Sequence, residues 1–169
     1  MSLALFHAIL FYMFAAVAVG AALAMVTQRN PTYSAFALIV TLVSLAAVFG
    51  LLGSPFIAAL QIVVYAGAIM VLFLFVLMLL NVKAELRAEG EGRVFTLVAL
   101  ALGAVLAGEV GSVLVAVRTP MAGAFDASAR AVAHVLFEPR YLYVFEATSI
   151  LILASLVGAI ALAKRDPNP

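Results

Sequence analysis

The stretch IAALQIVVYAGAIMVLFLFVLMLL at residues 57–80 decides the fold, because its 24 residues include no Asp, Glu, Lys or Arg. About 20 consecutive apolar residues are enough for a helix to cross the hydrocarbon core of a bilayer. The stretch exceeds this length without any interruption by charge. It therefore predicts a membrane-spanning helix.

The rest of the chain has the same character. Of its 169 residues, 67% are hydrophobic and 10% are charged, and the mean hydropathy is +1.27. Soluble domains are about 45–50% apolar and about 25% charged, so an ordinary globular enzyme is excluded. We predict an all-α integral membrane protein, a single membrane domain over residues 1–169, with five transmembrane helices at residues 4–26, 33–52, 57–80, 94–117 and 141–163.

The connections between these runs indicate how the helices are arranged. The turn at Gly53–Phe56 is so short that helices two and three must be antiparallel neighbours. Residues 81–93 are rich in charge and predict a solvated loop. The connection at residues 118–140 is the longest, and we expect a short amphipathic stretch in it at residues 129–137, with Ser128 among its candidate caps.

Lysine and arginine predict the orientation. With five spans, the two termini lie on opposite faces of the membrane. The face with the amino terminus carries three cations, Arg118, Arg130 and Arg140. The other face carries six, Arg29, Lys83, Arg87, Arg93, Lys164 and Arg165. The excess of positive charge on the cytoplasmic side of membrane proteins therefore predicts an external amino terminus and a cytoplasmic carboxyl terminus.

Several classes of site are excluded by composition. Without cysteine, the chain has no disulfide scaffold, thiolate-bound iron–sulfur cluster or cysteine-based zinc site. His7 and His134 lie far apart in the sequence, and no glycine-rich phosphate loop is present. The net charge of +1 provides no basic face for nucleic acid. We therefore expect no catalytic residue, metal, redox cofactor or nucleotide on this chain.

Two carboxylates fall inside predicted spans. Glu109 lies in the fourth and Glu146 in the fifth, where Ser149 is one helical turn away. A charge at the bilayer centre costs about 2.5–3.5 kcal/mol on insertion scales, so neither side chain is expected to face lipid. Each is either a hydrogen-bonded residue at a subunit contact or a member of a proton path, and the sequence leaves both interpretations open.

Small residues recur along the same two helices and mark candidate packing faces: Gly103, Ala107, Gly108 and Gly111 in the fourth helix, and Gly158 in the fifth. Small side chains allow helix backbones to approach closely in lipid. This pattern predicts a close neighbour for the fourth helix, either in this chain or in another.

The third helix combines polar and small residues at its middle. Gln61 and Tyr65 are four residues apart and share one face. Tyr65, Ala66, Gly67 and Ala68 form a run of mainly small residues between bulky turns, where a π-bulge or kink is expected. Simple close packing against a neighbouring helix is the alternative interpretation.

Three stretches resemble one family of membrane proteins. Residues 58–75, AALQIVVYAGAIMVLFLF, are similar to the signature third helix of the chain J family of proton-pumping NADH:quinone oxidoreductase, respiratory complex I. Residues 30–38, NPTYSAFAL, resemble the start of its second helix, and residues 145–160 resemble its fifth. The resemblance runs in order along nearly the whole chain, although the two long loops match only in position.

This resemblance implies a non-catalytic subunit in the membrane arm of a bacterial inner-membrane complex. It places the chain beside chains A, H, K and N, and assigns FMN, the iron–sulfur clusters and quinone to other subunits. In the family, a π-bulge around Tyr65 to Gly67 switches the third helix between bulged and regular forms and so gates a water path toward chain K. We expect Tyr65 to position water between the apolar side chains of Val64, Ile69 and Val71.

The chain departs from the family in one respect, and one residue has no counterpart there. At Gln61 some members carry glutamate, so this chain has one titratable group fewer, and Glu109 matches no motif of the family. Three alternatives remain: a subunit of a related ion-translocating hydrogenase or antiporter complex, a small stand-alone transporter, or a scaffold with no part in gating. The transporter is disfavoured because such proteins usually contain internal repeats, and no convincing repeat is present.

Overall fold

The computed structural model describes residues 2–80, 93–116 and 127–164, and across these residues all regular secondary structure is helical. Five helical segments are long and apolar enough to cross a membrane. They are α1 (Ser2–Thr27), α2 (Pro31–Leu51), the continuous helix made of α3 (Pro55–Leu60), η1 (Gln61–Ile69) and α4 (Met70–Leu79), then α5 (Arg93–Ala116) and α7 (Leu142–Ala163). A short helix, α6 (Ala129–Leu136), precedes α7. The predicted all-α class and the five candidate spans are thus confirmed for the described part of the chain.

The α1–α2 hairpin is fixed by local polar contacts. The Asn30 side chain accepts a hydrogen bond of 2.9 Å from the backbone N–H of Thr32, and Pro31 occupies the first turn of α2, where its missing N–H costs nothing. The Ser34 hydroxyl donates to the backbone carbonyl of Met25 across the turn at 2.8 Å. These contacts hold the start of α2 against the end of α1.

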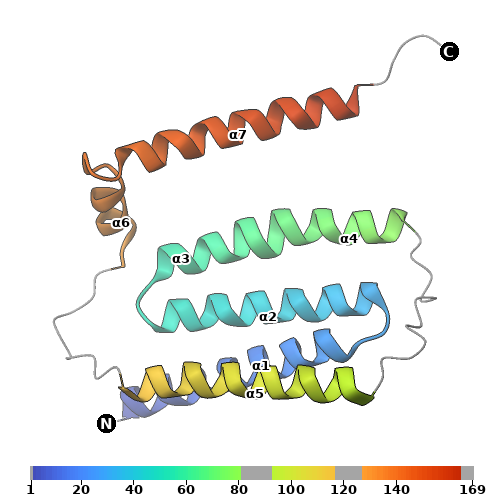
Figure 1. The fold of residues 1–169 in the computed structure, drawn as a ribbon. Helices are drawn as coiled ribbons and strands as arrows, with labels where there is room; N and C mark the ends of the chain where they lie inside the picture. Colours follow the sequence, from blue (N-terminus) through green and yellow to red (C-terminus); the bar gives the residue numbers. More distant parts are fainter. Residues whose placement is uncertain (1, 81–92, 117–126, 165–169) are drawn as a thin grey trace.

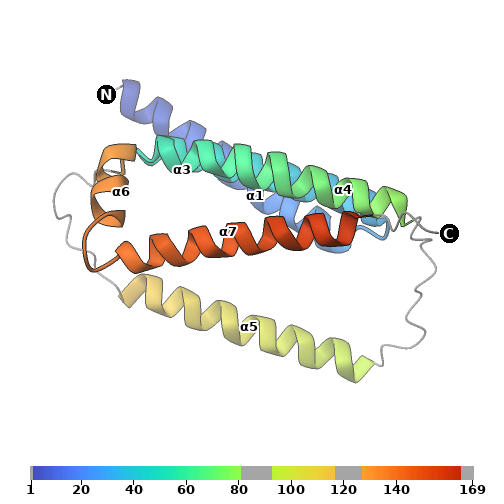
Figure 2. The same cartoon turned by 90° about the horizontal axis from the view of Figure 1, so that it is seen from above.

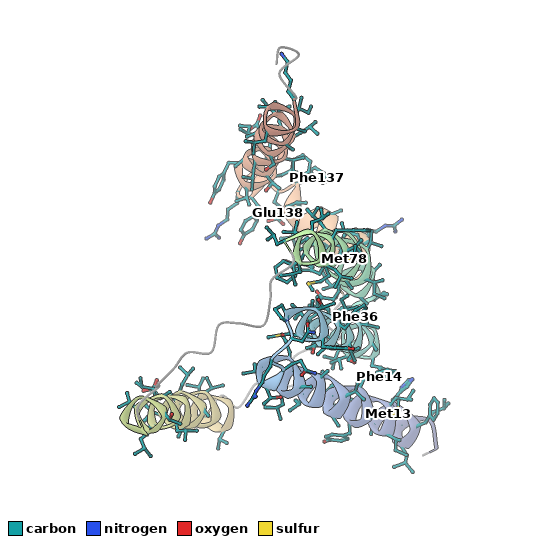
Figure 3. All side chains as sticks on the ribbon, turned by 90° about the vertical axis from the view of Figure 1, so that its right-hand side faces the viewer. Met13, Phe14, Phe36, Met78, Phe137 and Glu138 are labelled. Carbon is teal, nitrogen blue, oxygen red and sulfur yellow. The ribbon has the colours of Figure 1, made fainter. Side chains whose placement is uncertain are left out.

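Helices α1, α2 and the α3–η1–α4 segment lie side by side in one row, with α2 in the middle (Figures 1 and 3). The turn between α2 and α3 contains Gly53 at φ +80°, a left-handed conformation that glycine adopts without strain. The buried residues of the row are mostly small: Ala18, Ala35, Ser44, Ala46, Ala66 and Met70. Small side chains at the contacts let the helix backbones approach closely, as in other membrane proteins.

Helices α5 and α7 stand apart from this row. All extended contacts between described spanning helices are made within the row, and no residue in the spanning windows of α5 or α7 is buried. In Figure 1 α5 overlaps α1, but Figure 3 shows α5 to one side, and α7 lies beyond the other edge of the row. Two of the five spans therefore leave nearly their whole surface free in this chain.

The short helix α6 crosses the end of the molecule and turns the chain into α7 (Figures 1 and 2). Its N-cap is Ser128, whose hydroxyl accepts from the N–H of Ala131 at 3.3 Å, so the cap expected from the sequence is confirmed at this residue. The rings of Phe137 and Phe145 meet edge to face at 4.9 Å and link α6 to α7. The elbow is therefore a packed joint between the two helices.

The two ends of the row differ in what they contain. The amino terminus, the α2–α3 turn and α6 lie at one end, named here the amino-terminal end, and the ends of α4 and α7 lie at the other (Figure 1). Which end faces the cytoplasm stays a prediction. Four of the nine cations on which that prediction depends, Lys83, Arg87, Arg118 and Arg165, lie outside the described residues, as does the loop at residues 81–92.

Candidate functional site

The middle of the third span is a π-helix, η1, which joins the α-helical segments α3 and α4. Most π-helical geometry in proteins is confined to single-turn bulges, often at functional sites. Here it extends over nine residues, from Gln61 to Ile69, and includes the run from Tyr65 to Ala68 at which the sequence predicts a bulge or kink. The third span therefore departs from regular helix at the candidate site.

Gly67 is the residue that this geometry most clearly requires. An ideal Cβ added at Gly67 would lie 3.1 Å from the carbonyl oxygen of Ile62, closer than ordinary van der Waals contact. The two residues are five apart, which is the hydrogen-bond spacing of a π-helix. A side chain at this position would require the Ile62 carbonyl to move by a few tenths of an ångström, so the glycine relieves crowding in the π-helical form.

One side of η1 faces the row and the other side is free. Ala66 and, just beyond η1, Met70 are buried, and α2 contacts both η1 and α4. Gln61 is half-buried and Tyr65 is 52% exposed. Neither of these two side chains makes a hydrogen bond within the described part of the chain. The two polar groups of η1 are thus available to water or to another polypeptide.

The hydroxyl groups of α2 do not extend this polar surface. Thr41 donates to the backbone carbonyl of Ala37 at 3.0 Å, and the buried Ser44 donates to that of Val40 at 2.8 Å. Both hydroxyls are therefore satisfied within their own helix. A water path past η1 has to use its free side, where Val64 and Ile69 are also exposed.

The structure does not bring the two membrane carboxylates against η1. Glu109 lies on α5 and Glu146 on α7, and both are exposed with no hydrogen bond from the described residues. Ser149 does not reach Glu146, because its hydroxyl donates to the backbone carbonyl of Phe145 at 3.2 Å. Over residues 2–80, 93–116 and 127–164, nothing covers either carboxylate.

The small-residue face of α5 is also open. A Cβ added at Gly103, Gly108 or Gly111 would meet nothing within 4 Å, and the same is true of Gly158 in α7. At 100° per residue, Glu109 lies roughly 160° around α5 from the centre of the Gly103–Ala107–Gly111 stripe. The carboxylate and the stripe therefore face in nearly opposite directions. No neighbour for either face is found within the described part of this chain.

Two features are not predicted from the sequence: Ile62, the partner of Gly67, and a cavity at the amino-terminal end. Nothing in the apolar sequence marks the carbonyl of Ile62 as the one that Gly67 approaches, since that contact arises from the five-residue spacing. The cavity lies between α6 and the starts of α3 and α7. A signal was available in the amphipathic pattern of α6, which indicates that one of its faces is covered.

The described residues contain no group of three or more His, Cys, Asp or Glu side chains that could hold a metal ion. The full sequence has no cysteine. The chain therefore has no thiolate ligands for an iron–sulfur cluster. What the chain offers at its candidate site is a non-standard helix with two free polar side chains.

Comparison with known proteins identifies one family. The family described as NADH-ubiquinone/plastoquinone oxidoreductase chain 6 matches residues 21–162. NADH-quinone oxidoreductase subunit J of Pseudomonas aeruginosa is 42% identical over 163 residues, covering 92% of this chain and 96% of that protein. Subunit J of Escherichia coli strain K12 is 36% identical over 160 residues, covering 92% and 86%. NAD(P)H-quinone oxidoreductase chain 6 of Synechocystis is 38% identical over 163 residues, covering 94% and 81%.

Proposed function

This chain belongs to the NADH-ubiquinone/plastoquinone oxidoreductase chain 6 family, and from that membership we propose that it helps to couple quinone reduction to proton translocation in respiratory complex I. It is a membrane subunit of that complex and a multi-pass protein of the bacterial inner membrane. Within the complex its role is non-catalytic, and the third span gates a water path while the chain also contributes to assembly.

The observation that carries the gating proposal is η1. A π-helix is less stable than an α-helix of the same length and persists where the surroundings or the sequence support it. Here the support is Gly67, which leaves room for the carbonyl of Ile62. A segment with two accessible backbone arrangements is the kind of two-state element that a coupled machine needs.

Interconversion of the two forms moves side chains by a predictable amount. When one π turn becomes an α turn, that turn contains about one residue fewer. The part of the helix after the turn then rotates by about 100° relative to the part before it. Tyr65 lies within η1, while Val71 lies just after it. Such a rotation exchanges polar and apolar side chains along the free side of the span. A path lined only by apolar side chains loses its water and closes.

The separation of α5 and α7 from the row supports a role inside an assembly. Apolar side chains tolerate lipid, but a carboxylate at the bilayer centre does not. Glu109 and Glu146 therefore face other subunits or an internal water path, and chains A, H, K and N are the partners that we propose. The small-residue stripe of α5 offers a second, independent face for close helix packing.

Redox chemistry belongs to other subunits in this proposal. FMN, iron–sulfur clusters and quinone are held elsewhere in the complex, because this chain lacks the thiolates and the nucleotide-binding loop that such groups use. Its residues contribute a path for protons and a conformational change. They do not contact the atoms that react.

Replacing Tyr65 with phenylalanine in the assembled complex tests the proposal. The change removes the hydroxyl and keeps the ring, and the loss of one hydrogen bond, about 0.5–1.5 kcal/mol, is expected to lower coupled turnover by about two- to tenfold. Proton pumping and NADH:quinone reduction are measured together in proteoliposomes. Tyr143→Phe on α7, where the ring is 70% exposed, is the matched control. If the Tyr65→Phe complex couples proton pumping to quinone reduction as well as the wild type does, the chain acts only as a scaffold.

A further inference from the structure

A cavity of about 450 Å³ lies at the amino-terminal end, between α6 and the first turns of α3 and α7. Its walls are largely aliphatic and come from all three helices, with Ile57 from α3, Val132 and Val135 from α6, and Val144 from α7. Figures 1 and 2 show α6 placed across the ends of these helices, which is where a spanning helix meets the membrane surface. The cavity is thus an apolar space at the boundary between hydrocarbon and water.

The faces of α6 fit this location. Ala131, Val132, Val135 and Leu136 line the cavity, whereas Arg130, Ala133 and His134 line a separate depression together with Glu138. One apolar face and one polar face are typical of helices that lie in the plane of a membrane interface. The apolar face of α6 is therefore turned toward a hydrocarbon environment, and its polar face toward water.

Polar groups are concentrated at two points of the cavity wall. The Ser54 hydroxyl is half-buried and the Tyr141 hydroxyl belongs to an exposed ring, and neither has a hydrogen-bond partner among the described residues. The Arg140 guanidinium lies 5.9 Å from the centre of the Tyr141 ring, a cation–π distance that holds the charge beside the cavity. Within the described part of the chain, no carboxylate forms an ion pair with Arg140.

We propose that this cavity binds an anionic glycerophospholipid, with one acyl chain between α3, α6 and α7 and the phosphate at Arg140. The hydroxyls of Ser54 and Tyr141 then donate to the ester or phosphate oxygens. An apolar space with two hydroxyl donors in its wall, and a cation stacked on one of their rings, matches a ligand that has a hydrocarbon tail and an anionic, acceptor-rich head. The site is separate from η1, so it does not depend on the gating role.

The size of the cavity favours an acyl chain over a helix of a partner subunit. A helix with its side chains is about 10–12 Å across, so a single turn fills roughly 400–600 Å³. The cavity therefore has room for about one turn and not for a spanning helix. An extended acyl chain is much narrower than a helix and can follow the wall between α3 and α7.

Photolabelling of the purified complex in proteoliposomes tests the site. The probe is phosphatidylglycerol with a photoreactive diazirine in one acyl chain, and phosphatidylcholine with the same chain is the zwitterionic comparison. We expect label on peptides of α3, α6 and α7, and more of it from the anionic lipid. Arg140→Gln is expected to reduce that preference about fivefold, as for the loss of one cation near an anionic surface.

Two matched pairs of variants separate this site from general lipid contact. Ala131→Phe places a ring in the cavity and is expected to abolish the α6 label, whereas Ala133→Phe on the opposite face is expected to retain it. Arg130→Gln is the corresponding control for Arg140→Gln. Three results would each overturn the proposal. The two lipids could label α6 equally, the label could persist in Ala131→Phe, or wild-type α6 could take no label because a polypeptide covers it. None of these results bears on proton pumping.

Discussion

Gly67→Ala is the substitution that most directly tests the two forms of the third span. The added methyl group would lie 3.1 Å from the carbonyl oxygen of Ile62 in the π-helix, so either the turn opens by a few tenths of an ångström or the π form is abandoned. A regular α-helix accommodates alanine at every position. The substitution therefore penalises one form and leaves the other free of strain.

Its magnitude follows from this contact. An added methyl group that must push on packed surroundings costs about 1–3 kcal/mol, and at about 1 kcal/mol the π form is disfavoured about fivefold. If the two forms are equally populated in the wild type, the π form falls from one half to about one sixth of the molecules. Coupled turnover that depends on that form then falls to about one third, and Gly67→Val is expected to lower it further.

The measurements are the structure of the assembled variant and its proton pumping with NADH as donor. Gly20→Ala in α1 is the control, because a Cβ added there meets nothing within 4 Å. A variant in which residues 61–69 keep the wild-type π geometry, with no opening between Ile62 and residue 67, would refute the steric argument. A variant in which they become regular while pumping stays at the wild-type rate would refute gating by this helix.

Three other substitutions address the remaining polar groups. Glu146→Gln is expected to weaken proton pumping or assembly of the complex, and wild-type values for both would assign the residue to neither role. Glu109→Leu is expected to reduce assembly by leaving a partner group unpaired, at about 1–3 kcal/mol, whereas Glu109→Gln retains assembly; a Leu variant that assembles normally would indicate that Glu109 faces lipid. Ser34→Ala removes the 2.8 Å bond to Met25 and is expected to destabilise the α1–α2 hairpin by about 1 kcal/mol, seen as a lower Tm of the complex. Thr148→Ala, whose hydroxyl bonds only within α7, is its control, and equal effects of the two would contradict the assignment.

The number of spans could be predicted because it depends on one local property, the length of an apolar run. Ser128 could be predicted as a cap for the same reason, since a cap is decided within four residues of sequence. The short turn at Gly53–Phe56 predicted that helices two and three are neighbours, which the contacts of α2 with α3, η1 and α4 confirm. The rest of the packing could not be predicted, because in lipid the driving force between helices is not hydrophobic burial and apolar residues face either way. The row formed by α1, α2 and α3–η1–α4 is visible only in three dimensions.

The residues of the candidate site also differ in whether the sequence marks them. Gly67 is marked by its own identity, since a glycine inside an otherwise bulky apolar helix is a local anomaly. The role of Ile62 is not marked, because the carbonyl group that meets Gly67 is common to every residue. For Glu109, the four-residue spacing of nearby glycines predicts a close neighbour, but only the helical angle places the carboxylate on nearly the opposite side of α5. The spacing of residues along the chain therefore identified the candidate residues, but it did not identify the groups that contact them.

The separation of α5 and α7 from the row has a consequence for folding. A spanning helix can insert as an independent unit because its backbone hydrogen bonds are internal, and its later packing depends on the groups that lipid cannot satisfy. In α2 the hydroxyls of Ser34, Thr41 and Ser44 are already satisfied, and in the row polar groups such as Gln61 and Tyr65 of η1 are left for other partners. In α5 and α7 the carboxylates of Glu109 and Glu146 have no partner within the described residues. The chain is therefore expected to insert with a stable three-helix row and to complete the placement of its last two spans only against other subunits. Pulse-labelled chain made without its partners should keep residues 1–80 protected from protease and lose α5 and α7 first; equal protection of all five spans would show that the isolated chain packs them itself.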